Sequence, residues 1–472
     1  MPASAPGAAA PASPLLEPPI LTPPATQKAA WTALVLWAAA IALAALAPAW
    51  APTFQGTAYV IGHFGALAAL WAIWRARPDP RVVLIGACLA AVLLIPAPAF
   101  TSHDVERYLW DGAVARVGAD PWRVHPDASD IKPLRAIWPT PAEHGLFPSL
   151  YPPAAMALFA FCAGFGPVGG FFAWKTMIAG AVIASVLIMR SVIADVARDK
   201  GAQGRWLALA ALNPLVVLET GVGGHLDAFV MLSITVALLA WRRGWPGLAG
   251  AALGLGATIK LLPIVLLGPL FLVSGLRRGL VMATISAWTI LLIYGLTFAL
   301  GFQPIGSLPN FFEKWRGGAP LFAVVSHVAP AHFVGLVQAG LGVFLLGIAA
   351  LIARIRPVAA MILALAAPLL ISPIGFAWYA LALAPLAALP LHIGPASTDR
   401  QAGLPSAALW SWMGLAPFSY EVLDRFNAAG HWAPADWPII VLGSGLALGF
   451  SLDVARLVSR RKSACAKNAR AA

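Results

Sequence analysis

Apolar stretches close to twenty residues long recur along this chain, and they limit its fold more than any other feature. Stretches of that length match the hydrocarbon thickness of a lipid bilayer. Only 11% of the 472 residues are charged, whereas soluble domains carry about 25%. The 43 glycines and 41 prolines fit short or broken membrane helices, whose freed backbone groups bond to neighbouring protein. The sequence therefore predicts an all-α polytopic membrane protein and excludes a string of soluble domains.

The net charge of +12 does not indicate a nucleic-acid partner, because the basic residues form short clusters between apolar segments. The positive-inside rule accounts for such clusters and places them in the cytoplasm. The three cysteines give no disulfide framework, since Cys88 and Cys162 lie in apolar segments and Cys465 lies in a basic tail. The expected surroundings are the lipid bilayer, with no nucleic acid.

Four regions follow from the apolar pattern. Residues 1–29 are rich in Ala and Pro and read as a disordered cytoplasmic extension rather than a signal peptide. Residues 30–275 form the membrane core, residues 276–458 are C-terminal membrane helices, and residues 459–472 are a basic cytoplasmic tail. The expected apolar segments lie at about 30–50, 57–74, 82–98, 170–192, 206–220, 227–241, 247–275, 280–301, 334–354, 357–372, 376–393, 405–420 and 437–458.

Placing every basic cluster in the cytoplasm imposes two local predictions. Residues 153–167 must lie on the membrane rather than cross it. Residues 247–275 must form a hairpin of two short helices, interrupted at LGATIKLLP. The result is about 12 to 14 transmembrane helices with both termini cytoplasmic.

One early loop, residues 99–151, is far more polar than the rest of the chain. This topology places it outside the cytoplasm, in the periplasm if the host is Gram-negative. It carries seven of the 19 acids: Asp104, Glu106, Asp111, Asp120, Asp127, Asp130 and Glu143. In a helix, Asp104, Arg107 and Asp111 share one face. Asp104 lies just beyond an apolar segment, where a carboxylate can meet a soluble hydroxyl while a lipid tail stays in the bilayer.

Four motifs in order carry a resemblance. They are SHDVERYLWDGAVARVGADPWR at 102–123, LYPPAAMALFAF at 150–161, NPLVVLETGVGGHLDA at 213–228 and GAALGLGATIKLLP at 250–263. Together they resemble the GT-C superfamily of membrane glycosyltransferases, and are most similar to the bacterial polyprenyl-phosphate-mannose-dependent mannosyltransferases. The resemblance covers about 99–275. Departures include Glu106 in place of an aromatic residue, DPW in place of NPY, and GVGGHLD in place of GNGHND.

The resemblance implies transfer of a hexose, mannose first, from a polyprenyl-phosphate sugar to an extracytoplasmic glycan or glycolipid by a single inverting displacement. It further implies an inner-membrane enzyme with an outward-facing active site. Attack by a hydroxyl requires a general base, for which Asp104 is the first candidate and Glu106 the second. The departing phosphate requires fixed cations, and the candidates are Arg107, Lys260, Lys175 and Arg316. The remaining candidate binding residues are Asp111, Tyr151, His225 and Asp227.

Structural explanations stand beside these roles. Asp104 fits a helix cap at the membrane surface, Asp111 a pair with Arg107 at i,i+4, and Lys260 a side chain that snorkels to the interface. No cofactor is indicated. His103 with Asp104 and Glu106, or His125 with Asp127, offers oxygen and nitrogen ligands, but neither spacing is typical of zinc or calcium. A bound divalent cation stays open.

Two other functions stay open. A secondary transporter or lipid-linked-glycan flippase needs intramembrane charges that face a pathway, and Lys175, Glu219 and Lys260 lie near or within apolar segments. A polysaccharide polymerase also uses lipid-linked glycans, but such enzymes usually place their large outer loop late in the chain.

Overall fold

The structure is a computed structural model. It describes residues 24–471 apart from 198, 309–315, 392–403 and 431. Within these residues the secondary structure is helical, with one isolated β-bridge between Gly317 and Ile374. The predicted disordered segment 1–29 lies largely outside the described residues. Helix α1 (Pro24–Ala45) begins before the predicted start of the first apolar segment, and the short helix α2 (Ala47–Trp50) follows it.

The predicted all-α polytopic membrane class is confirmed. In the described part of the chain six helices are long and apolar enough to cross a bilayer. They lie in α1, α3 (Gln55–Ala76), α7 (Gly166–Ala194), α13 (Leu276–Ala299), α16 (Val334–Ile352) and α21 (Trp437–Ala471). Shorter apolar helices stand beside them: α4 (Pro80–Leu93), α6 (Pro153–Ala163), α11 (Pro246–Ala257), α12 (Leu267–Ser274) and α17 (Pro357–Ile371). The total of 12 to 14 spans stays a prediction.

The remaining helices complete the bundle and its polar end. Helices α8 (Lys200–Ala211), α9 (Pro214–Gly221) and α10 (Asp227–Arg243) run through its middle, and α15 (Pro320–Val328) packs against α16, α17 and α21. The early loop contributes α5 (Asp104–Arg116), η1 (Lys132–Ala136) and η2 (Ala142–His144). The other elements are η3 (Leu262–Leu266), η4 (Ala331–Phe333), η5 (Ala377–Leu383), α18 (Ala384–Ala387), α19 (Ala407–Leu415), η6 (Ala416–Tyr420) and α20 (Glu421–Ala429).

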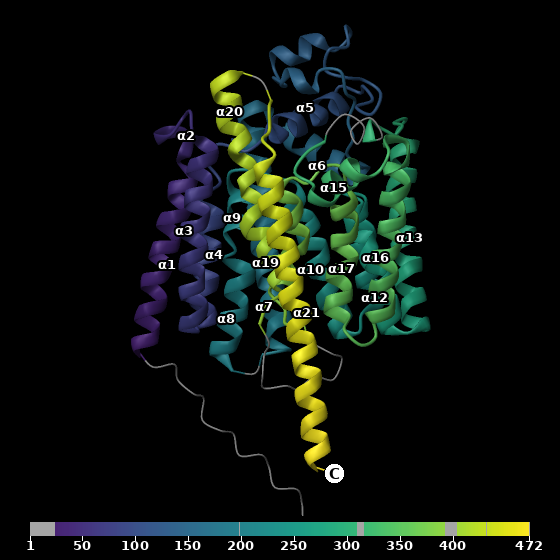
Figure 1. Ribbon diagram of the computed structural model, residues 1–472. Helices are drawn as coiled ribbons and strands as arrows, with labels where there is room; N and C mark the ends of the chain where they lie inside the picture. The colour runs from purple at the N-terminus through teal and green to yellow at the C-terminus, as the bar shows by residue number, and fades with distance from the viewer. Residues whose placement is uncertain (1–23, 198, 309–315, 392–403, 431, 472) are drawn as a thin grey trace, which may run out of the picture.

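The bundle has two unlike ends (Figure 1). Helices α2, α5 and α20 lie at one end, and the start of α1 and the C-terminal end of α21 lie at the other. Basic residues lie at the second end. The Arg205 guanidinium lies 3.3 Å from the Trp74 ring centroid, and the Arg243 guanidinium lies 3.5 Å from the Asp195 carboxylate. The early loop lies at the opposite end of the bundle from these residues. The positive-inside rule predicts that the basic end faces the cytoplasm.

The predicted hairpin in residues 247–275 is present. Gly244, just before α11, lies beside Arg278 near the start of α13, and α12 ends at Ser274 next to that same start. Lys260, between the two short helices, reaches a cavity at the opposite end of the bundle. Helix α6 has 11 residues, about 16 Å at the α-helical rise. The placement of residues 153–167 on the membrane stays a prediction.

Three predicted segments are not continuous α-helices. Residues 206–220 divide at Asn213, whose side chain accepts a hydrogen bond from the Leu215 N–H and caps α9, with Pro214 in its first turn. The predicted segment 376–393 contains the 3₁₀ segment η5 and the short α18, and its last two residues lie outside the described residues. Residues 405–420 divide into α19 and η6. Pro385 and Pro417 lie at these interruptions. A proline inside an α-helix clashes with the carbonyl four residues earlier, so a regular α-helix cannot continue through it undisturbed.

Candidate active site

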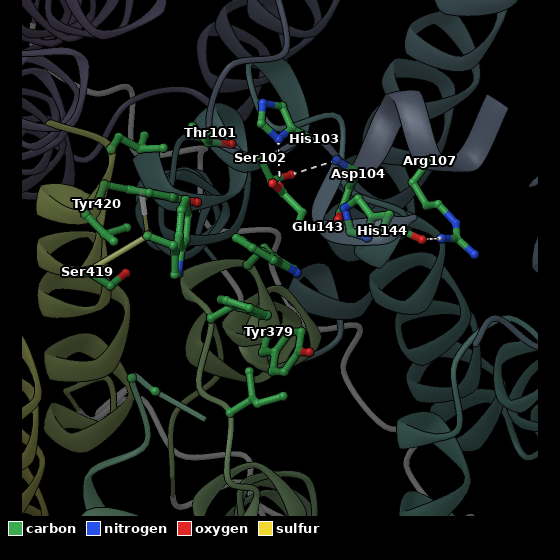
Figure 2. A pocket seen from close by; sticks show the side chains of 18 of the residues that line it. Thr101, Ser102, His103, Asp104, Arg107, Glu143, His144, Tyr379, Ser419 and Tyr420 are labelled. Carbon is green, nitrogen blue, oxygen red and sulfur yellow. Dashed lines mark hydrogen bonds and ion pairs between the residues drawn. The ribbon is translucent and has the colours of Figure 1, made fainter. Parts of the chain in front are cut away.

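A cavity of about 490 Å³ lies at the end of the bundle that carries α5 and α20. Segments far apart in the sequence line it: the start of α5, residues 143–151, the start of α10, Lys260, residues 316–318, residues 374–379, and η6 with α20. Figure 2 shows side chains from several of these segments converging there. Both acidic and basic side chains line the cavity, among them Asp104, Glu106 and Lys260.

Helix α5 carries the first two predicted catalytic residues in its first turn, where acidic side chains stabilise the helix dipole. The Ser102 hydroxyl accepts a hydrogen bond from the Asp104 N–H at 3.2 Å. The buried face of α5 packs against α6, and a Cβ at Gly112 would lie 2.3 Å from the Phe159 carbonyl. This close approach fixes the start of α5 at the cavity.

Asp104 is held by two partners. The Tyr108 hydroxyl donates to its Oδ2 at 3.0 Å, and His225 Nδ1 lies 3.3 Å from the same oxygen. Burial raises the pKa of Asp104, but the interactions with His225, His144 and Tyr108 outweigh burial and leave the pKa below its usual value. Asp104 is therefore a carboxylate at neutral pH. Glu106 also lines the cavity, is exposed, and has its pKa raised by partial burial.

Arg107 and Asp111 form a buried pair rather than an open cationic site. Arg107 Nε donates to Asp111 Oδ1 at 3.0 Å, and its two Nη atoms donate to the carbonyls of His144 at 3.2 Å and Phe147 at 2.8 Å. Figure 2 shows the Arg107 side chain reaching toward His144. Asp111 is fully buried and its pKa is raised by that burial. This geometry gives the pair a structural task, which is to hold residues 144–147 against α5.

Lys260 and Asp227 meet in the cavity wall. Lys260 Nζ lies 2.8 and 3.0 Å from the two Asp227 carboxylate oxygens and 4.0 Å from the Tyr379 ring centroid. The Lys260 side chain is 25% exposed, whereas Asp227 is 1% exposed. The ammonium group is thus a fixed cation on the cavity surface, with its own counter-ion behind it.

The remaining candidates lie at different depths. Tyr151 lines the cavity with its ring centroid 5.1 Å from that of Tyr108, and the exposed Arg316 lines it beside two glycines. Lys175 is buried away from the cavity, where its Nζ donates to the carbonyls of Ala97 and Gly221. His225 is also fully buried, and it contacts Asp104, which lines the cavity.

Sequence reasoning assigned no catalytic part to several residues of this site. Glu219, noted above among the intramembrane charges, accepts hydrogen bonds from the hydroxyls of Tyr59 and Tyr420. Trp378 stacks on His225 with centroids 4.0 Å apart. An acid within an apolar segment is a signal for function. Its partners could not be read from the sequence, since they lie 160 and 201 residues away.

His103 and Glu143, which both line the cavity, form a clip between the start of α5 and η2, with His103 Nδ1 2.9 Å from Glu143 Oε1 (Figure 2). Their hydrogen bond raises the pKa of His103 and lowers that of Glu143. A histidine with a raised pKa stabilises the fold fully at pH values below its unfolded-state pKa. A glutamate with a lowered pKa stabilises the fold fully at pH values above its unfolded-state pKa. The clip is therefore complete between the ordinary values of 4.5 and 6.5.

We expect this clip to open as pH rises through the raised pKa of His103. Amide exchange in residues 142–147, corrected for its intrinsic pH dependence, should then become faster in the wild type. His103→Gln should remove that pH dependence, and it provides the control. Equal protection in both proteins across the range would contradict the assignment. The effect should be modest, because both side chains are partly exposed.

Within the described residues, no group of three or more His, Cys, Asp or Glu side chains has an arrangement that could hold a metal ion.

Comparison with known proteins adds one finding. Residues 150–373 match the model of glycosyltransferase family 87, a GT-C-like family of membrane enzymes. No curated protein and no solved structure matches the chain. The matched region includes the candidates Tyr151, Lys175, His225, Asp227 and Lys260 and begins after α5. The match supports a glycosyltransferase enzyme.

Proposed function

Starting from a glycosyltransferase, we propose that the chain moves a hexose, with mannose the first candidate, from a polyprenyl phosphate to a glycan or glycolipid acceptor. One observation carries the proposal: the Asp104 carboxylate and the Lys260 ammonium line the same cavity at the polar end of a membrane bundle. A base and a phosphate-binding cation in one cavity suit a donor that is both a lipid and a sugar phosphate.

The transfer is a single displacement. An acceptor hydroxyl attacks the anomeric carbon, and its proton passes to Asp104. A carbon–oxygen bond forms as the bond to the phosphate oxygen breaks, and the polyprenyl phosphate leaves with the bonding electrons. Because attack and departure take place on opposite faces of the carbon, the anomeric configuration inverts. Glu106 is the second candidate for the base.

Lys260 suits the departing phosphate. Its charge is fixed by Asp227 and by the Tyr379 ring, so it needs little reorganisation when negative charge develops on the leaving oxygen. Arg316 is a second cation on the cavity wall. Lys175 and Arg107 already donate to backbone carbonyls, which makes them weaker candidates for this part.

The buried charges argue against a transport pathway. Lys175 is bonded to carbonyls, and Glu219 is bonded to two tyrosines and lies against His225. Charges with such internal partners do not line an open route for a solute. The positive-inside rule puts the cavity outside the cytoplasm, so we place the protein in the plasma membrane with its site facing outward.

Purified protein in liposomes tests the proposal. Radiolabelled polyprenyl-phosphate mannose, the glucose and arabinose analogues, and GDP-mannose should be offered as donors with membrane glycan acceptors. We expect label to pass from a polyprenyl-phosphate sugar and not from the nucleotide sugar; liposomes without protein serve as the control. Transfer from GDP-mannose alone would overturn the lipid-donor proposal. Movement of a lipid-linked glycan across the bilayer without transfer would favour the flippase alternative.

A further inference from the structure

A row of buried polar side chains runs inward from Asp104 and ends at Glu219, which has no part in the transfer described above. His225 lies between the two acids, with Nδ1 3.3 Å from Asp104 Oδ2 and Nε2 3.3 Å from Glu219 Oε2. Both His225 and Glu219 are fully buried. A buried carboxylate is costly unless it is paired, so this one needs a physical explanation.

Glu219 has a complete set of partners. The Tyr59 hydroxyl donates to Oε1 at 2.6 Å, and the Tyr420 hydroxyl donates to Oε2 at 2.7 Å. Tyr59 lies on α3 and Tyr420 ends η6. Short hydrogen bonds to an ionised acceptor are among the strongest in proteins. Two helical segments from opposite ends of the chain therefore fix the position of one carboxylate.

The His225 ring is fixed as well. It stacks on Trp378 with an interplanar angle of 13°. Gly224, in the left-handed region with φ of 63°, turns the chain just before it, and the Gly224 carbonyl accepts a hydrogen bond from Trp174 Nε1 at 2.7 Å. Each ring nitrogen lies 3.3 Å from a carboxylate oxygen, Nδ1 on the Asp104 side and Nε2 on the Glu219 side. Between two carboxylates the imidazolium form is favoured.

Asp104 needs a cation behind it. Besides the buried His225, the charged and titratable groups around it are those that line the cavity: His103, Glu106, Arg107, Tyr108, Glu143, His144, Tyr151, Asp227, Lys260, Arg316, Tyr379 and Tyr420. Nearby carboxylates and an incoming donor phosphate all favour protonation of Asp104, which would remove its capacity as a base. A buried imidazolium opposes this effect.

We propose that Glu219 is a positioning residue for the transfer: held by Tyr59 and Tyr420, it keeps His225 charged and oriented, and His225 keeps Asp104 ionised and aimed into the cavity. The inference rests on the proposed function, in which Asp104 receives the acceptor proton. It also gives a reason for the tyrosines on α3 and η6, since they tie the base to both ends of the chain.

Glu219→Gln tests the inference, because it removes the charge and keeps the shape. We expect kcat at neutral pH to fall about tenfold, a part of the 10²–10⁴ that a positioned base supplies, with the donor KM little changed. Loss of a nearby cation should raise the pKa of Asp104, because the charged carboxylate is then less stabilised. The activity of Glu219→Gln, relative to that of the wild type at the same pH, should therefore decrease further as the pH is lowered from 7 to 5.

Tyrosine variants guard against a folding artefact. Tyr59→Phe and Tyr420→Phe each remove one hydroxyl from Glu219 and should shift the pH profile in the same direction by a smaller amount. Tyr294→Phe is the matched control, since Tyr294 is half-buried on α13 and does not line the cavity. If Glu219→Gln does not fold, these single-hydroxyl variants decide the question.

The outcomes separate the inference from the function. If the wild type transfers sugar and Asp104→Asn does not, an unchanged kcat and pH profile in Glu219→Gln overturns the inference alone. If the wild type transfers no sugar, the proposed function fails and the row is tested by NMR of ¹⁵N-histidine, with His225→Gln to assign the signal. A doubly protonated His225 that becomes neutral in Glu219→Gln supports the row, and a neutral His225 in both proteins overturns it.

Discussion

Asp104→Asn should reduce sugar transfer by about 10²–10⁴-fold, the contribution typical of a positioned general base. Asparagine keeps the size of the side chain and still accepts the hydrogen bond from Tyr108, so the fold should be retained. The measurement is the initial rate at saturating donor and acceptor, with the amount of folded protein matched by size-exclusion chromatography. The loss should fall on kcat rather than on KM, because the amide occupies the same space and cannot take up the proton.

Two variants of the same loop control this result. Glu106→Gln changes an exposed acid that lines the same cavity, and it should cost much less than Asp104→Asn. Asp130→Asn changes an exposed acid outside the cavity lining and should leave transfer unchanged. A large loss in Glu106→Gln with normal rates in Asp104→Asn would move the base to Glu106.

Lys260→Met should also cause a large loss, about 10²–10³-fold in kcat, the range found when one fixed electrostatic donor to a transition state is removed. Methionine keeps an apolar stem against Tyr379 and removes the charge. The variant has a second effect, because it leaves the buried Asp227 carboxylate without its cation. Breaking a buried pair in this way costs about 3–5 kcal/mol of stability, so activity and thermal stability must be measured together.

The double variant Lys260→Met with Asp227→Asn separates the two effects. Neutralising Asp227 removes the unpaired buried charge, so the melting temperature should recover toward the wild-type value while transfer stays low. Lys260→Arg keeps the charge and should retain part of the activity. Recovery of both stability and transfer in the double variant would show that Lys260 has a structural part only.

The membrane class and the contribution of the early loop to the cavity could be predicted from the sequence. Long apolar segments have few folds open to them, because every backbone group within a bilayer must bond inside the protein. The loop 99–151 differs from the apolar segments because it is rich in charged residues, which are rare within a bilayer. Asp104, Glu106 and Tyr151 of this loop line the cavity. The interruption at Lys260 predicted a hairpin, and the structure has one. These features depend on composition and local spacing, which a single sequence contains.

The choice of partners required the tertiary structure. Spacing indicated that Arg107 and Asp111 share a helix face, but it could not show that Arg107 also bonds to the carbonyls of His144 and Phe147. The 3₁₀ segment η5 was predicted as part of a regular apolar segment. Pro385 and Pro390, which follow η5 in the same predicted segment, indicate an interrupted helix, but how the chain bends there depends on what it packs against.

Glu219 shows the limit most clearly. In the sequence it is one acid in an apolar run, with nothing beside it to say whether it is paired. In the structure it accepts hydrogen bonds from tyrosines 160 and 201 residues away and lies against the histidine that holds Asp104. The sequence by itself determined that the chain is a helical membrane protein and that its most polar segment is one early loop. Only the tertiary structure decided which charges meet, because a contact between distant residues depends on packing and leaves no local pattern.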